Sequence, residues 1–131
     1  MKRMIPILLM MTLLLTGCAV PKPATEANTY RQITMQEAVE MMEKEENYII
    51  LDVRTHEEYA AGHIPGAIVV PNETIGTEEI PQLPDKDQLI MVYCRSGNRS
   101  RQASDKLVKL GYTNIVEFGG IIDWPGEIVT D

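Results

Sequence analysis

The chain has 131 residues, which is the length of one domain, and its formal net charge is −7 at pH 7. It is 44% hydrophobic but only 5% aromatic, so we expect an aliphatic core. The sequence contains no basic stripe and no basic patch interleaved with aromatic residues, which argues against a nucleic-acid partner.

The N-terminus has the pattern of an export signal. A basic start, Met1-Lys2-Arg3, precedes an apolar run over residues 4–15 that is too short to span a bilayer well. The following Leu15-Thr16-Gly17-Cys18 resembles the bacterial lipobox, in which the cysteine is lipidated and becomes the first residue. We therefore expect residues 1–17 to be a lipoprotein signal peptide and Cys18 to anchor an exported domain to the bacterial membrane, outside the cytoplasm. An ordinary signal peptide or an uncleaved anchor are the alternatives.

A linker separates this anchor from the domain. Residues 20–29 hold two prolines among small polar residues, which do not build a core. Residues 18–29 are thus expected to be the lipidated cysteine and linker, and residues 30–131 the single domain.

Strands and helices are predicted to alternate through the first half of the domain. Two capping boxes, Thr34 with Glu37 and Thr55 with Glu58, each predict the start of a helix. The first helix should end within residues 43–47 and the second at Gly62. Apolar runs predict strands over residues 30–33, 48–53 and 68–70.

The second half continues this alternation. Residues 71–87 contain three prolines and predict a loop with one helical turn around residues 73–80. Strands are predicted over residues 89–93 and 114–117, and a helix from Asn98 or Arg99 to Leu110. Gly119-Gly120 should open a short final helix containing Trp124. This order predicts an α/β fold with a central parallel sheet and helices on both faces.

Cys94 lies where a buried strand ends and a helix begins. The intervening turn carries a glycine and two arginines, and backbone N–H groups at a helix start attract anions. In such a setting a cysteine pKa falls to about 3.5–7.5 from about 8.5, so the thiolate is favoured. With Cys18 lipidated, Cys94 has no disulfide partner and is explained better by chemistry than by packing. Ligands of open parallel sheets also bind beyond the carboxyl ends of the strands, where Cys94 lies.

The charge around this loop points to a small anionic ligand. Arg95, Arg99 and Arg101 cluster there on an otherwise acidic chain, although Arg101 can equally be a solvated helix residue. The sequence has no Cys/His cluster for a metal and no glycine pattern for a nucleotide, so we expect neither metal nor cofactor.

Three segments together resemble the single-domain rhodanese family, the thiosulfate sulfurtransferase-like proteins. They are Asp52-Val53-Arg54 with Glu58-Tyr59 and Gly62-His63-Ile64-Pro65-Gly66-Ala67, then the loop from Cys94 to Ser100, and last Gly119-Gly120-Ile121 with Trp124. The resemblance covers Tyr30 to the end of the chain and implies a rhodanese-like fold.

The resemblance implies sulfurtransferase chemistry. Cys94 would take a sulfane sulfur from an anionic donor such as thiosulfate, hold it as a persulfide and pass it to cyanide or a thiol. The loop that would bind the persulfide is Arg95, Ser96, Gly97, Asn98, Arg99 and Ser100. Arg99 would hold the loop and its charge, and Arg95 would bind the donor at the mouth. Ser100 would either donate to the sulfur or cap the helix.

Four upstream residues are expected to support the loop. Arg54 and Glu58 are spaced to pair with each other, and Asp52 lies at a strand end where it can contact the loop. The motif position of His63 implies a scaffold role rather than that of a general base.

Two other functions compete with this prediction. Phosphatases and arsenate reductases also use a cysteine-arginine loop, but related phosphatases have five residues between the two, whereas four separate Cys94 from Arg99. The smaller ring suits a sulfur atom better than a tetrahedral oxyanion. A non-enzymatic sulfur carrier or redox sensor is the other alternative. A monomer is the default expectation, and the physiological donor and acceptor stay open.

Overall fold

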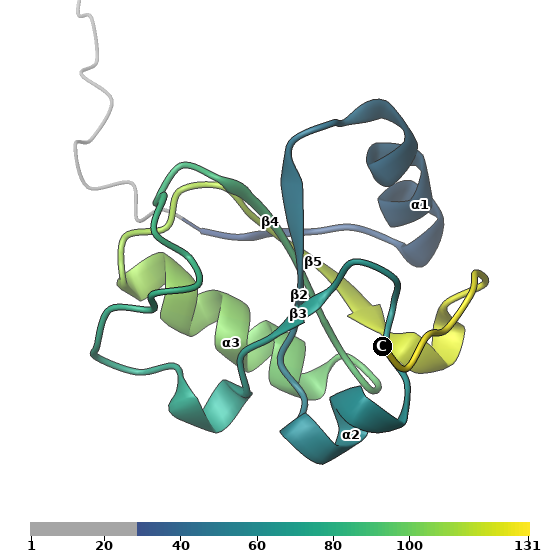
Figure 1. Ribbon diagram of the computed structural model, residues 1–131. Coiled ribbons are helices and arrows are strands. Elements are labelled where there is room, and N and C mark those ends of the chain that lie inside the picture. Colours follow the sequence, from purple (N-terminus) through teal and green to yellow (C-terminus); the bar gives the residue numbers. More distant parts are fainter. Residues whose placement is uncertain (1–28) are drawn as a thin grey trace, which may run out of the picture.

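The computed structural model describes residues 29–131, so the expected signal peptide, Cys18 and nearly all of the linker lie outside the described residues. The described part is an α/β domain in which helices flank a twisted sheet (Figure 1). In chain order its elements are β1 (Arg31–Gln32), α1 (Met35–Lys44), β2 (Tyr48–Asp52), α2 (His56–Ala61), β3 (Ile68–Val69), the 3-10 turn η1 (Asn72–Thr74), β4 (Leu89–Cys94), α3 (Asn98–Lys109), β5 (Ile115–Gly120) and the 3-10 turn η2 (Ile121–Asp123).

The sheet has five strands in the order β1-β5-β4-β2-β3, and every neighbouring pair is parallel. The predicted α/β class and parallel sheet are therefore confirmed. Strand β4 lies in the middle, so its carboxyl end is flanked by β5 and β2. A register shift after Val92 brings Cys94 opposite Gly120 of β5.

Both predicted capping boxes are present and start their helices where expected. The backbone N–H of Glu37 donates to Thr34 Oγ1 at 3.1 Å, and that of Thr34 donates to the Glu37 carboxylate at 2.9 Å. Thr55 and Glu58 repeat this arrangement before α2. Each box satisfies N–H groups that the first turn of a helix leaves without partners.

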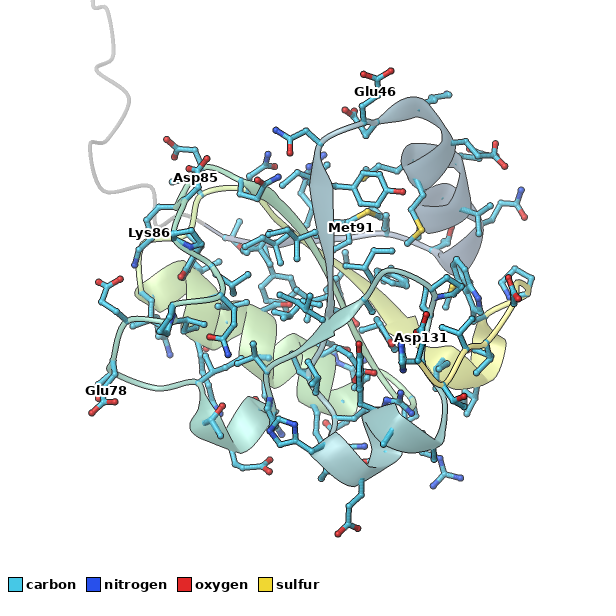
Figure 2. All side chains as sticks on the ribbon, in the orientation of Figure 1. Glu46, Glu78, Asp85, Lys86, Met91 and Asp131 are labelled. Carbon is cyan, nitrogen blue, oxygen red and sulfur yellow. The ribbon has the colours of Figure 1, made fainter. Side chains whose placement is uncertain are left out.

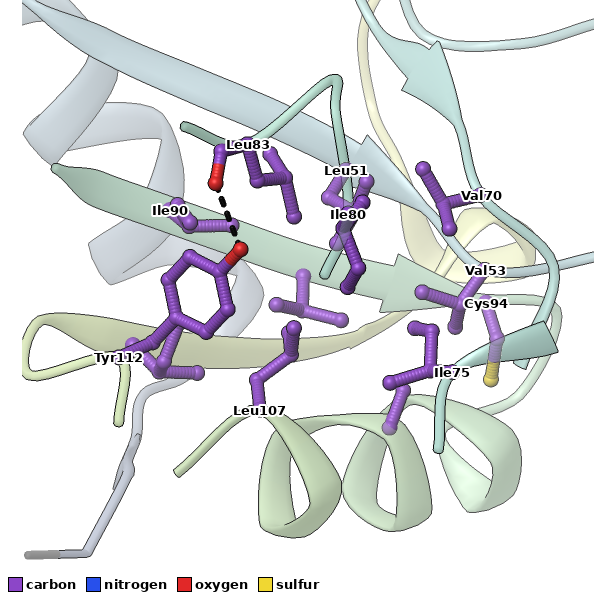
Figure 3. Packing of buried hydrophobic residues seen from close by; sticks show 13 residues of the cluster. Leu51, Val53, Val70, Ile75, Ile80, Leu83, Ile90, Cys94, Leu107 and Tyr112 are labelled. Atoms are coloured by element: carbon purple, nitrogen blue, oxygen red, sulfur yellow. Dashed lines mark hydrogen bonds between the residues drawn. The ribbon is translucent and has the colours of Figure 1, made fainter. Parts of the chain in front are cut away.

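Two apolar layers hold the helices against the sheet. On one face Ala38 of α1 packs with Met91 and Phe118, and Met91 lies centrally in the molecule while labelled acidic side chains such as Glu46 and Glu78 project from its rim (Figure 2). On the other face Leu107 of α3 packs in a cluster that extends to Cys94 (Figure 3). The predicted helices on both faces are thus confirmed, and Cys94 sits at the edge of a packed core.

Two local predictions are met only in part. Gly119 and Gly120 complete β5, because Gly120 pairs with Cys94 across the sheet, and Gly120 is at the same time the N-cap of the helical turn that follows. The final helix is only the single turn η2, and Trp124 follows it. The helical turn expected around residues 73–80 is η1, which begins one residue earlier and ends at Thr74. None of the helices within residues 29–131 has the length and apolarity needed to cross a membrane.

The packing of α3 gives the first testable prediction. Leu107 is fully buried between α3 and the sheet, so Leu107→Ala should lower the free energy of unfolding by about 2–5 kcal/mol through lost burial and a residual cavity. Urea denaturation measures this. The exposed Lys109→Ala variant on the same helix should change it by less than about 0.5 kcal/mol. Equal effects of the two substitutions would contradict the core placement.

Candidate active site

Cys94 is the last residue of β4 and is only 1% exposed. It lies at the end of the strand beside Val53, on the side of the sheet that α3 covers (Figure 3). The residues that follow turn outward: Arg95, Ser96 and Asn98 are exposed, whereas Gly97 and Ser100 are buried. The sulfur is therefore held below a loop whose polar side chains reach solvent.

Hydrogen bonds converge on the Cys94 sulfur. The backbone N–H of Gly97 donates to Sγ at 3.0 Å, and Ser100 Oγ lies 3.4 Å from it. Burial raises the pKa of the Cys94 thiol, but the hydrogen bonds that the sulfur makes with the Ser100 hydroxyl and with the backbone of Ser100, Gly97 and Ser96 outweigh it. The net pKa is lowered, in the direction that the sequence predicts.

Two glycines shape the loop around the sulfur. Gly97 precedes α3 with a φ of 108°, a left-handed conformation that suits glycine, and this turns its N–H toward Cys94. Gly120 lies behind the loop, where a Cβ would collide with the carbonyl group of Arg95. The same carbonyl oxygen accepts a hydrogen bond from the N–H of Ile122 at 3.3 Å. The end of β5 thus backs the loop closely.

Ser100 is not a helix cap. Gly97 occupies the residue before α3, and Ser100 is the third residue of the helix, directed at the sulfur. Of the two roles that the sequence leaves open for Ser100, the structure therefore favours contact with Cys94.

Arg99 fixes the loop to α2. Its guanidinium donates two hydrogen bonds to the Glu58 carboxylate, at 2.7 and 3.0 Å. This bidentate pair, with hydrogen bonds from Thr55, lowers the pKa of Glu58 to about 2. The negative charge of Cys94 adds to that of Glu58 in raising the pKa of Arg99, so the arginine acts on the sulfur through its charge.

The expected pairing of Arg54 with Glu58 is wrong. Arg54 is buried and instead binds the Asp52 carboxylate through its backbone N–H and its guanidinium, with a shortest distance of 2.6 Å. Its guanidinium also donates to the Gly62 carbonyl at 2.7 Å. Glu58 is thereby free to bind Arg99, because Asp52 lies closer to Arg54 at the end of β2.

Asp52 supports the loop from beneath rather than contacting it. Its carboxylate accepts a hydrogen bond from the Tyr93 hydroxyl at 2.7 Å, and that hydroxyl accepts one from the N–H of Ile64 at 3.2 Å. Tyr93 immediately precedes Cys94, and burial raises its pKa. Sequence reasoning missed Tyr93, although a tyrosine in a buried strand must find a partner for its hydroxyl.

His63 is held by residues outside the cysteine loop. Its Nδ1 donates to the Tyr59 carbonyl at 2.8 Å, its Nε2 lies 3.2 Å from Asp131, and its ring stacks on Tyr59. Its backbone pairs with Val129. This arrangement fits the expected scaffold role.

Sequence reasoning also missed Glu117. This carboxylate lies in β5 between Val116 and Phe118, is 3% exposed, and accepts a hydrogen bond from Ser100 at 2.6 Å. The sequence signal that could have revealed it is a glutamate in the middle of an otherwise apolar strand. For cofactors, residues 29–131 contain no group of three His, Cys, Asp or Glu that could hold a metal ion.

Comparison with known proteins identifies the family. Residues 34–126 match the family model described as the Rhodanese-like domain. The chain belongs to the rhodanese-like family. The match spans the Asp52 segment, the Cys94 loop and the β5 end, which are the three segments that the sequence predicts to be diagnostic.

Two curated relatives of this rhodanese-like domain are named as sulfurtransferases. The chain is 37% identical over 73 residues to the thiosulfate sulfurtransferase PspE of Escherichia coli K12, covering 56% of this chain and 70% of that protein. It is 42% identical over 82 residues to a sulfurtransferase of Allochromatium vinosum, covering 60% and 73%. A solved structure described as rhodanese with anions from E. coli aligns with a TM-score of 0.59 and 33% identity, covering 64% of this chain and 99% of that one. At the level of the family, the chain is a rhodanese-type sulfurtransferase.

The ion pair between Arg99 and Glu58 gives the second prediction. Arg99→Ala should raise the Glu58 pKa from about 2 toward the ordinary value of about 4.3, because the guanidinium favours the carboxylate. The stabilisation by this pair is therefore present above pH 4.3 and is lost as the pH falls toward 2. Side-chain NMR titration of Glu58 measures the shift.

The exposed Arg101→Ala variant is the matched control and should leave the Glu58 pKa near 2. Because the Arg99 and Glu58 side chains are 30% and 31% exposed, the pair should contribute at most about 1 kcal/mol to stability. An unchanged Glu58 pKa in Arg99→Ala would show that Arg99 does not hold this carboxylate in solution.

Proposed function

We propose that the protein transfers a sulfane sulfur from an anionic donor such as thiosulfate to cyanide or a thiol through a persulfide on Cys94. The observation that carries this proposal is the buried Cys94 sulfur with hydrogen-bond donors aimed at it, at the carboxyl end of the central strand. Such a sulfur is favoured as a thiolate, which is the nucleophilic form of cysteine.

The chemistry takes place in two steps. The Cys94 thiolate attacks the outer sulfur of thiosulfate, a new S–S bond forms, and the S–S bond of the donor breaks as sulfite leaves with the electron pair. The outer sulfur of the persulfide is then attacked by cyanide, and thiocyanate forms as the Cys94 thiolate leaves. No external oxidant or reductant is needed, because in each step one bond to the transferred sulfur forms as another bond to it breaks.

The loop suits the charge that moves in these steps. Backbone N–H groups at the start of α3 are fixed in place and need no reorganisation when charge develops on sulfur. Arg99 adds a positive charge held in position by Glu58, and the exposed Arg95 can meet an anionic donor at the loop mouth. A similar solved structure is described as rhodanese with anions from E. coli, which is consistent with an anionic donor for this chain.

The loop size favours sulfur over phosphate. Only four residues separate Cys94 from Arg99, and Gly120 packs against the loop from behind. Enlarging the loop to surround a tetrahedral oxyanion would have to displace the end of β5. This argues against phosphatase or arsenate reductase activity.

The third prediction tests the proposed nucleophile. Purified protein should form thiocyanate from thiosulfate and cyanide, and Cys94→Ser should reduce this to the uncatalysed rate because serine cannot form the persulfide. The surface variant Lys109→Ala should keep the full rate. Thiosulfate-treated protein should carry one added sulfur atom on the Cys94 peptide by mass spectrometry.

The outcomes separate the competing functions. Thiocyanate formation that survives Cys94→Ser would overturn the mechanism. One added sulfur without turnover would indicate a sulfur carrier, and faster hydrolysis of an aryl phosphate than sulfur transfer would indicate a phosphatase.

We also propose that Cys18 is lipidated and tethers the exported domain to the bacterial membrane, on the strength of Leu15-Thr16-Gly17-Cys18 after an apolar run.

The fourth prediction is that Cys18→Ala moves the protein from the membrane to the soluble fraction, because the acyl attachment is lost. Fractionation followed by immunoblotting measures this. Cys94→Ser, which also removes a thiol, should stay with the membrane; membrane retention of Cys18→Ala would indicate an uncleaved anchor instead.

A further inference from the structure

Glu117 is a buried carboxyl group without a cationic partner among the described residues. Its hydrogen-bond partners are the Gln32 side chain at 3.3 Å, the Ser100 hydroxyl at 2.6 Å and the Gly119 N–H at 2.8 Å, all of them neutral. A buried carboxylate without a counter-charge is costly. This unfavourable free energy of burial points to a role for Glu117 beyond packing. Ser100, which contacts both Glu117 and the Cys94 sulfur, indicates what that role is.

Ser100 joins Glu117 to Cys94 through one hydroxyl group. Its Oγ lies 2.6 Å from Glu117 Oε2 and 3.4 Å from Cys94 Sγ. The carbonyl oxygens of Gly97 and Gly119 are further acceptors, at 3.0 and 3.3 Å. A hydroxyl has a single proton, so Ser100 cannot donate to the sulfur and to Glu117 at the same time.

The direction of the Ser100 proton therefore depends on where the charge is. When Glu117 is ionised, Ser100 donates to it and accepts from the Cys94 thiol. When Glu117 is protonated, its own O–H can donate to Ser100, and Ser100 donates to the Cys94 thiolate. The two arrangements hold the same number of protons and the same net charge, and two short proton shifts interconvert them.

We propose that Cys94, Ser100 and Glu117 form a proton relay, in which Glu117 takes up the thiol proton through Ser100 when Cys94 becomes a thiolate. The S–H bond breaks and an O–H bond forms on Ser100, while the original Ser100 proton passes to Glu117 Oε2. The negative charge moves from the carboxylate to the sulfur, and no proton leaves the site. Glu117 is thus a positioning residue that acts on the sulfur through Ser100.

The hydrogen-bond donors on the two sides reduce the free-energy cost of moving the charge from Glu117 to the sulfur. The sulfur accepts hydrogen bonds from backbone N–H groups of the loop and of the start of α3, and it interacts electrostatically with the positive charge of Arg99. On the other side, Glu117 has only the Gly119 N–H and the Gln32 amide once Ser100 turns away. Better solvation of charge at the sulfur offsets part of the ordinary preference for an ionised carboxylate over a thiolate.

The elements packed around the relay carry several other charged groups. They are Arg99, Arg101, Asp105, Lys106 and Lys109 of α3, Asp52 of β2 with the adjacent Arg54, Glu58 of α2, Glu73 of η1, Asp123 of η2 and Arg31 of β1. Arg99 is paired with Glu58, and Arg31 donates to Asn114 at the far end of β5. Within residues 29–131 neither a hydrogen bond nor an ion pair joins any of these groups to Glu117.

The test is the pH dependence of Cys94 alkylation by iodoacetamide in the full chain, followed by mass spectrometry of the Cys94 peptide. It needs no sulfur donor, so its outcome is independent of the proposed sulfurtransferase function. Two groups that share a proton titrate in two steps. The alkylation rate of the wild-type protein should therefore rise with pH through two inflections, because part of the thiolate forms in the one-proton state.

Glu117→Gln keeps the size of the side chain and an oxygen that accepts from Ser100, but it cannot take up a proton. Its alkylation profile should show one inflection, lying between the two of the wild type. This is expected because the first wild-type step is the loss of one proton from either Cys94 or Glu117, which lowers its apparent pKa. The second step is the loss of the remaining proton, which the negative charge already present in the pair opposes. The exposed Glu43→Gln variant changes the net charge equally and should keep both inflections.

Two results would overturn the proposal. A single inflection in the wild type would mean that Glu117 does not exchange a proton with Cys94, and this holds even if Glu117→Gln fails to fold. Two inflections that persist in a folded Glu117→Gln protein would assign the second titration to another group. A purely structural role of Glu117 predicts the same number of inflections in both proteins.

Discussion

The site depends on one constraint, which is that the sulfur of Cys94, a residue only 1% exposed, must be able to carry negative charge. Burial alone opposes this, so hydrogen-bond donors have to replace water. They come from the backbone, because the chain turns from β4 into α3 within three residues and directs N–H groups back at Cys94. The central place of β4 in the sheet and the left-handed Gly97 make that turn possible.

Two ion pairs support this turn, one between α3 and α2 and the other at the end of β2. Arg99 of α3 is held by Glu58 of α2, so the helix that supplies the N–H groups cannot shift without breaking a bidentate contact. Asp52 binds Arg54 and the Tyr93 hydroxyl, which fixes the strand just before the cysteine. Because Asp52 satisfies Arg54 so closely, Glu58 is available to Arg99, and the pair between Glu58 and Arg99 therefore depends on the pair between Asp52 and Arg54.

Local patterns in the sequence were sufficient for most of the fold, whereas contacts between distant residues were not. The capping boxes and apolar runs gave the helix starts and strands, since the signals for these lie within a few residues. The pairing of Arg54 with Glu58 was predicted from their spacing in the sequence and was wrong, because Glu58 binds a residue 41 positions away. Glu117 was missed for the same reason: its contact with Ser100 exists only after β5 packs against α3.

Different groups at the loop stabilise the negative charge on Cys94 and accept its proton. Fixed backbone N–H groups can stabilise a sulfur anion, but they cannot accept its proton, and the neutral hydroxyl of Ser100 can only pass one on. Glu117 is the side chain within reach that can keep it. The Gly119 N–H that binds Glu117 immediately precedes Gly120, the residue that packs against the Arg95 carbonyl. The end of β5 therefore positions both the proton acceptor and the back of the loop, and a displacement of this strand would alter the charge and the proton on Cys94 together.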